Sequence, residues 1–158
     1  MNNPPSKVVQ INTQTVKDFE AMEGVKAVTP LASFPALITI DGLTGNTFLQ
    51  GAEPAFFRYT GAAASAGDLF IEGEDAKNAD GVILTKAVLK LFGIEKPEDA
   101  IGKSDTFRIF VPKEGTDQSE EIAIEKAYKV VAITKEENSI AAMLLLSELA
   151  SHVNITTY

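Results

Sequence analysis

The sequence contains no cysteine, no tryptophan and a single histidine, His152. Without a thiolate there is no cysteine nucleophile and no cysteine-based zinc site, and one imidazole cannot form a histidine pair around a metal ion. No G-x-S-x-G motif accompanies His152, so we interpret it as a helix-end residue and not as a catalytic base. The absence of cysteine agrees equally with a reducing cytoplasm and with an outward-facing bacterial protein.

Basic residues and long apolar runs are also scarce. The 14 Lys and Arg residues are outnumbered by 22 Asp and Glu residues, which gives a net charge of −8. A nucleic-acid binder needs a basic stripe to displace counterions from phosphates, so nucleic acid is excluded as a partner. The longest apolar run covers residues 141–146, far short of the ~20 residues that cross a bilayer.

Motifs for catalysis and for cofactor binding are missing as well. There is no G-x-x-x-x-G-K-[ST] run, so this chain does not itself hydrolyse a nucleotide. Acidic clusters at 72–75, 98–99 and 136–137 offer paired carboxylates, but glycoside chemistry also needs an aromatic-walled groove, and we interpret them as solvated loops. Residues 72–80 lack the spacing of a calcium loop. We therefore expect no enzyme activity, no cofactor and no metal ion.

What is present is typical of one folded domain, since 158 residues with 45% hydrophobic and 23% charged residues suffice for a single core. The patterns predict strands over 7–11, 25–29, 36–40, 46–50, 81–84, 105–111 and 122–134, and helices over 15–22, 54–59, 86–92 and 148–153. Residues 140–146 fit either a buried strand or a helix start. Strands and short helices mixed without a strict βαβ rhythm predict an α+β fold with one or more mixed sheets.

The connections carry their own signals. We expect a hairpin loop over 41–45, a loop of small residues over 60–66 and a solvent-exposed polar loop over about 113–121. The helix after 81–84 is expected to start at an N-cap, Thr85, and to end at Gly93. Its expected buried face consists of Ala87, Val88, Leu91 and Phe92.

The nine phenylalanines are spaced as core residues, and Phe56 and Phe57 form their only adjacent pair. Pro54 suits the first turn of a short helix that carries this pair. Adjacent helical positions do not face the same way, so one of the two rings can be exposed. Core packing is the favoured interpretation, and Phe56 and Phe57 are at the same time the candidate contacts for a partner.

The order of the motifs is more informative than any one of them. In sequence they are 22–30 (MEGVKAVTP), 49–57 (LQGAEPAFF), 66–70 (AGDLF), 81–87 (GVILTKA), 91–93 (LFG), 100–103 (AIGK) and 128–133 (YKVVAI). This order resembles the MacB-type periplasmic core domain, the extracytoplasmic domain of FtsX-like ABC transporter permeases. The resemblance covers about residues 12–134. It departs from the family at Ala132, where glycine is common, and it is poor after residue 135.

The resemblance implies an extracytoplasmic core domain over 12–153, with flanks at 1–11 (next to a membrane helix) and 154–158. Its ATP-binding partner would be a separate subunit or domain that acts through the membrane helices, and an adaptor or substrate protein would be met outside the membrane. The implied location is the outer side of the cell membrane, with this chain a soluble fragment of a permease. The implied function is transmission of ATP-driven motion. The alternative is a secreted or cell-surface module that binds a ligand or protein without catalysis, with an apolar pocket near Phe56 or Phe70.

Overall fold

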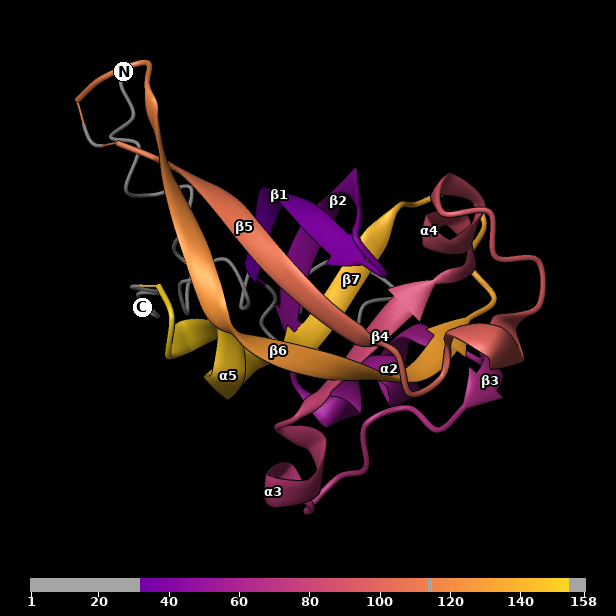
Figure 1. Cartoon of the computed structure of the whole chain (residues 1–158). Coiled ribbons are helices and arrows are strands. Elements are labelled where there is room, and N and C mark those ends of the chain that lie inside the picture. Colours follow the sequence, from indigo (N-terminus) through magenta and orange to yellow (C-terminus); the bar gives the residue numbers. More distant parts are fainter. Residues whose placement is uncertain (1–31, 114, 154–158) are drawn as a thin grey trace.

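One mixed sheet of seven strands dominates the computed structural model, which describes residues 32–113 and 115–153 (Figure 1). The strands are β1 (Ala32–Ile40), β2 (Leu43–Ala52), β3 (Ala64–Gly67), β4 (Gly81–Thr85), β5 (Ser104–Pro112), β6 (Ser119–Thr134) and β7 (Ala141–Leu145). The helices are α2 (Pro54–Thr60), α3 (Asp75–Asn78), α4 (Lys86–Leu91), α5 (Leu146–Ala150) and the 3-10 turn η2 (Pro97–Ala100). The expected α+β class is confirmed, whereas the elements expected at 7–11, 15–22 and 25–29 lie outside the described residues.

The sheet closes on itself. Its strand order is β3-β6-β4-β7-β2-β1-β5, and β5 pairs again with β6, so six strands form a ring and β3 is attached to its outside. The long strand β6 makes this closure, because its first part pairs with β5 and residues 129–134 pair with β4. The β2–β7 and β4–β6 pairs are parallel, and the other pairs are antiparallel. Closing a sheet removes the free edges that would otherwise pair with other chains.

The main hydrophobic core fills the ring. Buried residues alternate along β1 and along β5, as expected when one face of each strand points inward. The largest fully buried side chains include Phe34, Ile38, Leu49, Phe107 and Tyr128. Helix α4 follows the end of β4 and α5 follows the end of β7. Because β4 and β7 are antiparallel, these helices lie at opposite ends of the ring.

The hairpin between β1 and β2 is tighter than expected. Ile40 pairs with Leu43, so the turn consists of Asp41 and Gly42 alone. Their φ angles are 53° and 80°, the pair of positive values that a type I′ turn requires. Residues 43–45 therefore belong to β2, and the expected five-residue loop was wrong, because the twist of a two-residue I′ turn already matches that of the strands.

Two other loops also contain strand residues. The loop expected over 60–66 includes β3, which forms because the edge of β6 offers hydrogen-bond partners that the local sequence does not reveal. At the end of β3, Gly67 has a φ of 71°, and a Cβ there would lie 2.0 Å from the carbonyl oxygen of Val131. The polar loop is shorter than 113–121, since β6 begins at Ser119, which pairs with Pro112.

Helix α4 buries the expected Ala87 and Val88, and Phe92 packs partly buried against the core, but Leu89 is buried in place of Leu91. Ala87, Val88 and Leu89 are its buried residues, and Leu91 is half exposed. Thr85 is the N-cap residue, as expected, but its hydroxyl makes no cap hydrogen bond. Instead it donates to the Ser139 carbonyl (2.6 Å) and accepts from the N–H of Ala141 (3.1 Å), tying β4 to the start of β7.

At the carboxyl end, 141–145 is a strand, and the last helix covers Leu146–Ala150 in place of 148–153. No helix among the described residues is long and apolar enough to span a membrane.

Candidate interaction surface

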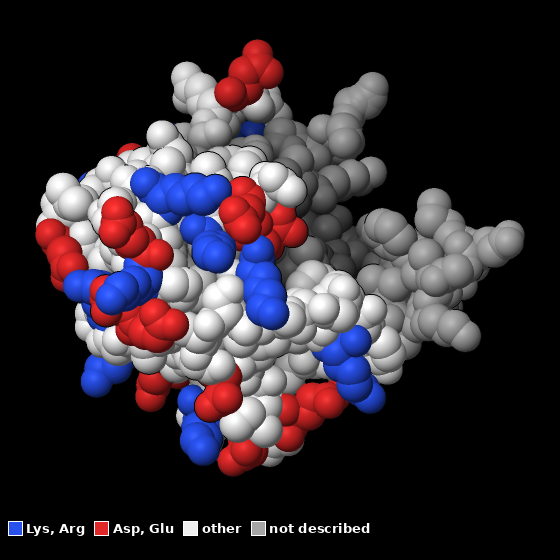
Figure 2. All heavy atoms as spheres, turned by 90° about the vertical axis from the view of Figure 1, so that its right-hand side faces the viewer, with Lys and Arg blue, Asp and Glu red and all other residues white. Residues whose placement is uncertain are grey.

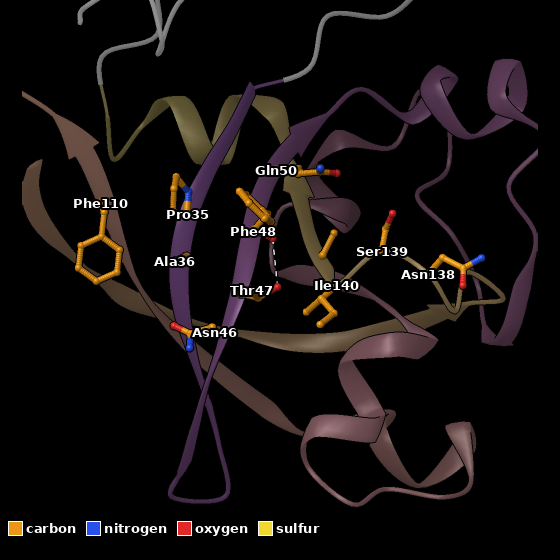
Figure 3. A pocket seen from close by; sticks show the side chains of 11 residues that line it. Pro35, Ala36, Asn46, Thr47, Phe48, Gln50, Phe110, Asn138, Ser139 and Ile140 are labelled. Atoms are coloured by element: carbon orange, nitrogen blue, oxygen red, sulfur yellow. Dashed lines mark hydrogen bonds between the residues drawn. The ribbon is translucent and has the colours of Figure 1, made fainter.

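Two neighbouring grooves lie on the outer face of the sheet. Groove 1, with a volume of about 640 Å³, is shown in Figure 3. It is lined by Pro35, Ala36, Asn46, Thr47, Phe48, Gln50, Phe110, Asn138, Ser139, Ile140 and Ala141. Groove 2, of about 630 Å³, lies beside α2 and is lined by Gln50, Phe56, Phe57, 60–63, Thr85, 134–136, Ser139, Ala141 and Met143. The two grooves share Gln50, Ser139 and Ala141, so they adjoin.

The alternation of β2 creates the floor of groove 1. Thr47 and Leu49 are buried, whereas Phe48 between them points outward and is 50% exposed. Pro35 is its partner on β1 in the strand register. The loop before β7 adds Ile140, which is also partly exposed, from the opposite side of Phe48. The result is an apolar floor in which the Phe48 and Ile140 side chains are exposed.

Phe56 and Phe57 have different positions at groove 2. Phe57 is only 4% exposed and packs edge-on against Phe70, with their ring centroids 5.9 Å apart. This contact fixes α2 to the outer face of the sheet. Phe56 is partly exposed at the groove, with its ring 5.5 Å from that of Phe57. A partner contact made by this pair therefore goes through Phe56, and it stays a prediction.

The single histidine belongs to a polar cluster between β6 and α5. Nε2 of His152 lies 2.9 Å from the buried Tyr128 hydroxyl, which donates to Glu148 Oε1 at 2.8 Å. The same oxygen accepts from Lys126, which also pairs with Asp80. Burial, followed by the Glu148 hydrogen bond, raises the pKa of Tyr128 well above its usual range. The cluster ties the last helix to the ring, and sequence reasoning missed Tyr128 because its partners lie 20 and 24 residues away.

Glu148 is held ionised within this cluster. Burial alone would raise its pKa, but the hydrogen bonds from Lys126 and Tyr128 outweigh that effect and lower it. In return, hydrogen bonds to Glu148 and then to Asp80 raise the pKa of Lys126. The opposite shifts of the two partners are those of an ion pair.

Asp105 is the second buried ionisable group that sequence reasoning missed. It is fully buried at the start of β5, and neither carboxylate oxygen has a hydrogen-bond partner within the described chain. Burial, with the nearby charge of Asp41, raises its pKa to about 8, although Lys103 opposes the shift. Its place in the inward alternation with Phe107 and Ile109 was the available signal.

The acidic clusters lie at the surface, as expected. Glu72 forms an exposed ion pair with Arg58, and Glu137 forms one with Lys90. On the face seen in Figure 2, positive and negative side chains are interspersed. Across residues 32–113 and 115–153, no group of three or more His, Asp or Glu side chains is placed to hold a metal ion.

The MacB-like periplasmic core domain family matches residues 2–156, almost the whole chain. The chain belongs to this family. No curated protein sequence matches the chain. The family match confirms the resemblance inferred from the motif order, and with it the assignment to the extracytoplasmic domains of MacB-like ABC transporter permeases.

Solved structures of MacB-like domains share the fold. The periplasmic region of MacB from Actinobacillus actinomycetemcomitans aligns with a TM-score of 0.61 and 15% identity, covering 90% of this chain and 58% of that one. The extracellular domain of the ABC-type transporter YknZ from Gram-positive bacteria aligns with a TM-score of 0.60 and 16% identity, covering 89% and 65%. A domain of a putative permease from Porphyromonas gingivalis aligns with a TM-score of 0.53 and 16% identity, covering 88% and 59%. The chain thus spans less than two thirds of the length of each.

The motif residues of this MacB-like domain specify the fold. Pro54 starts α2, and Gly67 lets β3 approach the backbone of β6. Neither residue lines groove 1, and the floor residues Phe48 and Ile140 stand outside the seven motif segments. The motif order therefore identifies the family, and the motif segments also supply Gln50 and Phe56 to the grooves.

Proposed function

We propose that this domain transmits the ATP-driven motion of a permease's membrane helices as a rigid body and contacts a substrate or partner protein outside the membrane. The observation that carries the proposal is the closed ring of six strands with its filled core. Protein interiors are close-packed and transmit strain, so a ring filled by side chains and covered at both ends moves as one unit.

The connection at the carboxyl end supports the same role. Leu149 and Val153 are both in the main core, and Glu148 binds the Tyr128 hydroxyl of β6. A displacement applied to the chain beyond α5 therefore reaches the ring through buried contacts. The outer face with grooves 1 and 2 moves with the ring and is available for a partner.

A role without catalysis fits the two buried ionisable groups. Asp105 has no exposed surface, and the Tyr128 hydroxyl is occupied by Glu148 and His152. A general acid or base must reach its substrate directly or through one water molecule. Neither group meets this requirement, so we assign both to the folded structure.

The proposal is tested by distance measurements in the permease with its ATP-binding subunit in lipid nanodiscs. Because this domain lacks cysteine, Lys96→Cys and Lys113→Cys introduce spin labels at two exposed sites, one before and one after β5. We expect the distance between the two labels to stay constant during ATP turnover, while the distance from Lys113→Cys to a label in the membrane changes. A hydrolysis-deficient ATP-binding subunit is the matched control. An unchanged distance to the membrane during turnover would refute transmission of motion.

The grooves favour a second candidate function, a secreted or cell-surface binding module. Their volumes, about 640 and 630 Å³, are within the range of roughly 300–1,000 Å³ found for small-molecule sites. This alternative requires a signal peptide upstream in the gene and no ATP dependence. The permease requires flanking apolar segments of ~20 residues on both sides.

A further inference from the structure

We infer that grooves 1 and 2 form one track that binds an extended, uncharged peptide segment with apolar side chains. This inference rests on the proposed function, because it names the kind of partner that the outer face contacts. Three properties of the track carry it: its length, its hydrogen-bonding groups and its lack of charge.

The length of the track suits a short peptide. Its lining begins at Phe110 on β5, crosses β1 and β2, and reaches Met143 on β7 and Phe56 on α2. These four strands are consecutive neighbours in the sheet. Neighbouring strands are ~4.8 Å apart, so three spacings span roughly 14 Å, the length of about four extended residues. Because Gln50 lines both grooves, one bound molecule can occupy both of them.

The polar groups of groove 1 match a peptide backbone. The side-chain amides of Asn46, Gln50 and Asn138 surround the apolar floor, and each offers both donors and an acceptor. The one hydrogen bond drawn among these residues in Figure 3 runs from the Thr47 hydroxyl to the Phe48 carbonyl and uses none of the three amides. An extended peptide also presents donors and acceptors in alternation, and Phe48 provides an aromatic contact for its side chains.

The lack of net charge along the track disfavours two other occupants, a charged ligand and a second copy of this chain. No lining residue of groove 1 is charged, and at groove 2 the neighbours Lys135 and Glu136 oppose each other. A charged ligand would lose its hydration without gaining a counter-charge. A second copy of the chain is disfavoured because each copy carries a net charge of −8.

The test is fluorescence anisotropy on the full chain with a labelled, acetylated and amidated pentapeptide in which alanine alternates with phenylalanine and leucine. We expect Phe48→Ser in groove 1 and Phe56→Ser in groove 2 each to weaken binding at least tenfold. Leu43→Ser on β2 and Tyr59→Ser on α2 are matched controls, since both side chains are about half exposed and outside both grooves. We expect neither control to change binding. Thermal unfolding verifies that each variant is folded.

Several results would overturn the inference. Equal affinity for a peptide with two aspartates in place of the large residues would remove the requirement for an uncharged partner. An effect of only one of the two groove variants would show that the peptide binds in that groove alone and that the two grooves do not form one track. If the chain self-associates and Phe48→Ser abolishes this, a second copy of the chain occupies the groove. If the Phe48 ring is shielded from a soluble paramagnet before peptide is added, the groove is already filled. All these measurements are made without ATP, so their failure is distinguishable from failure of motion transmission.

Discussion

Replacing Asp105 by asparagine should stabilise this domain by an amount that increases with pH. The wild-type side chain is fully buried on β5, between Ile40 of β1 and Tyr128 of β6 in the strand register. Neither of its oxygens has a hydrogen-bond partner among the described residues. Burial and the charge of Asp41 raise its pKa from 3.8 to about 8, with Lys103 opposing the shift.

The magnitude follows from proton linkage. Below pH 3.8 both the folded and the unfolded state hold the proton, so ionisation has no effect on stability. Between pH 3.8 and about 8 the unfolded state releases the proton and the folded state keeps it, so stability falls by about 1.4 kcal/mol per pH unit. At pH 7 the penalty is on the order of 4 kcal/mol, a large part of the roughly 5–15 kcal/mol that stabilises a typical domain.

The assay is urea unfolding of the wild type and of Asp105→Asn at several pH values from 4 to 9. The asparagine cannot ionise, so its advantage should increase steadily up to about pH 8 and then level off. The unpaired amide of asparagine and the unpaired protonated carboxyl of Asp105 carry a similar penalty of about 1–3 kcal/mol, so this penalty largely cancels in the difference. Asp99→Asn, at an exposed carboxylate on η2, is the control. A difference that does not vary with pH would refute the reasoning, because it would mean that Asp105 is ionised in the folded protein.

Three further predictions concern backbone packing and the polar cluster, and urea unfolding measures all of them. Gly67→Ala should lower the free energy of unfolding by about 3 kcal/mol or more, because the new Cβ would meet the Val131 carbonyl. Gly73 also has a positive φ but has open space around it, so Gly73→Ala should lower the free energy of unfolding by only about 1–2 kcal/mol. Thr85→Val should cost about 2–3 kcal/mol by leaving two backbone groups of the β7 segment without their partner, and Thr85→Ser should retain most of the stability. Glu148→Gln should be less stable than the wild type at pH 7. The two stabilities should converge as the pH falls below the unfolded pKa near 4.5, because a carboxylate with a lowered folded pKa stabilises the domain only while it is ionised.

Each of these predictions has a contrary outcome. Equal losses at Gly67 and Gly73 would show that the contact with β6 is not tight. A serine as harmful as valine at position 85 would show that the hydroxyl does not bridge β4 and β7. A deficit of Glu148→Gln that does not decrease as the pH falls below 4.5 would show that the carboxylate acts through packing and not through its charge.

Local elements were largely predictable. Pro54 begins α2, and the alternating pattern of 105–111 is β5, because a fixed φ and a period of two act on neighbouring residues. The turn at Asp41 and Gly42 was located, but its length was overestimated by three residues. The motif order identified the family, because its motifs lie in or next to such local elements and follow one another in the order found in the family.

The candidate site was predictable only in part. The pair Phe56 and Phe57 was located on a short helix, but which ring is buried depends on Phe70 and on the strands beneath α2. Phe48 and Ile140 are 92 positions apart in the sequence, and they share groove 1 only because β2 and β7 are parallel neighbours. No local pattern specifies that pairing.

By itself, the sequence determined which features this domain lacks, namely thiol chemistry, an excess of basic residues, a nucleotide-binding loop and a long apolar run. It also located most of the described strands and identified the family that contains them. Only the tertiary structure decided that the sheet closes through β6, that β3 is a strand, and that Asp105 and Tyr128 are buried. The physical reason is that backbone angles and alternation depend on adjacent residues, whereas strand partners and the desolvation of a side chain depend on burial summed over the whole chain.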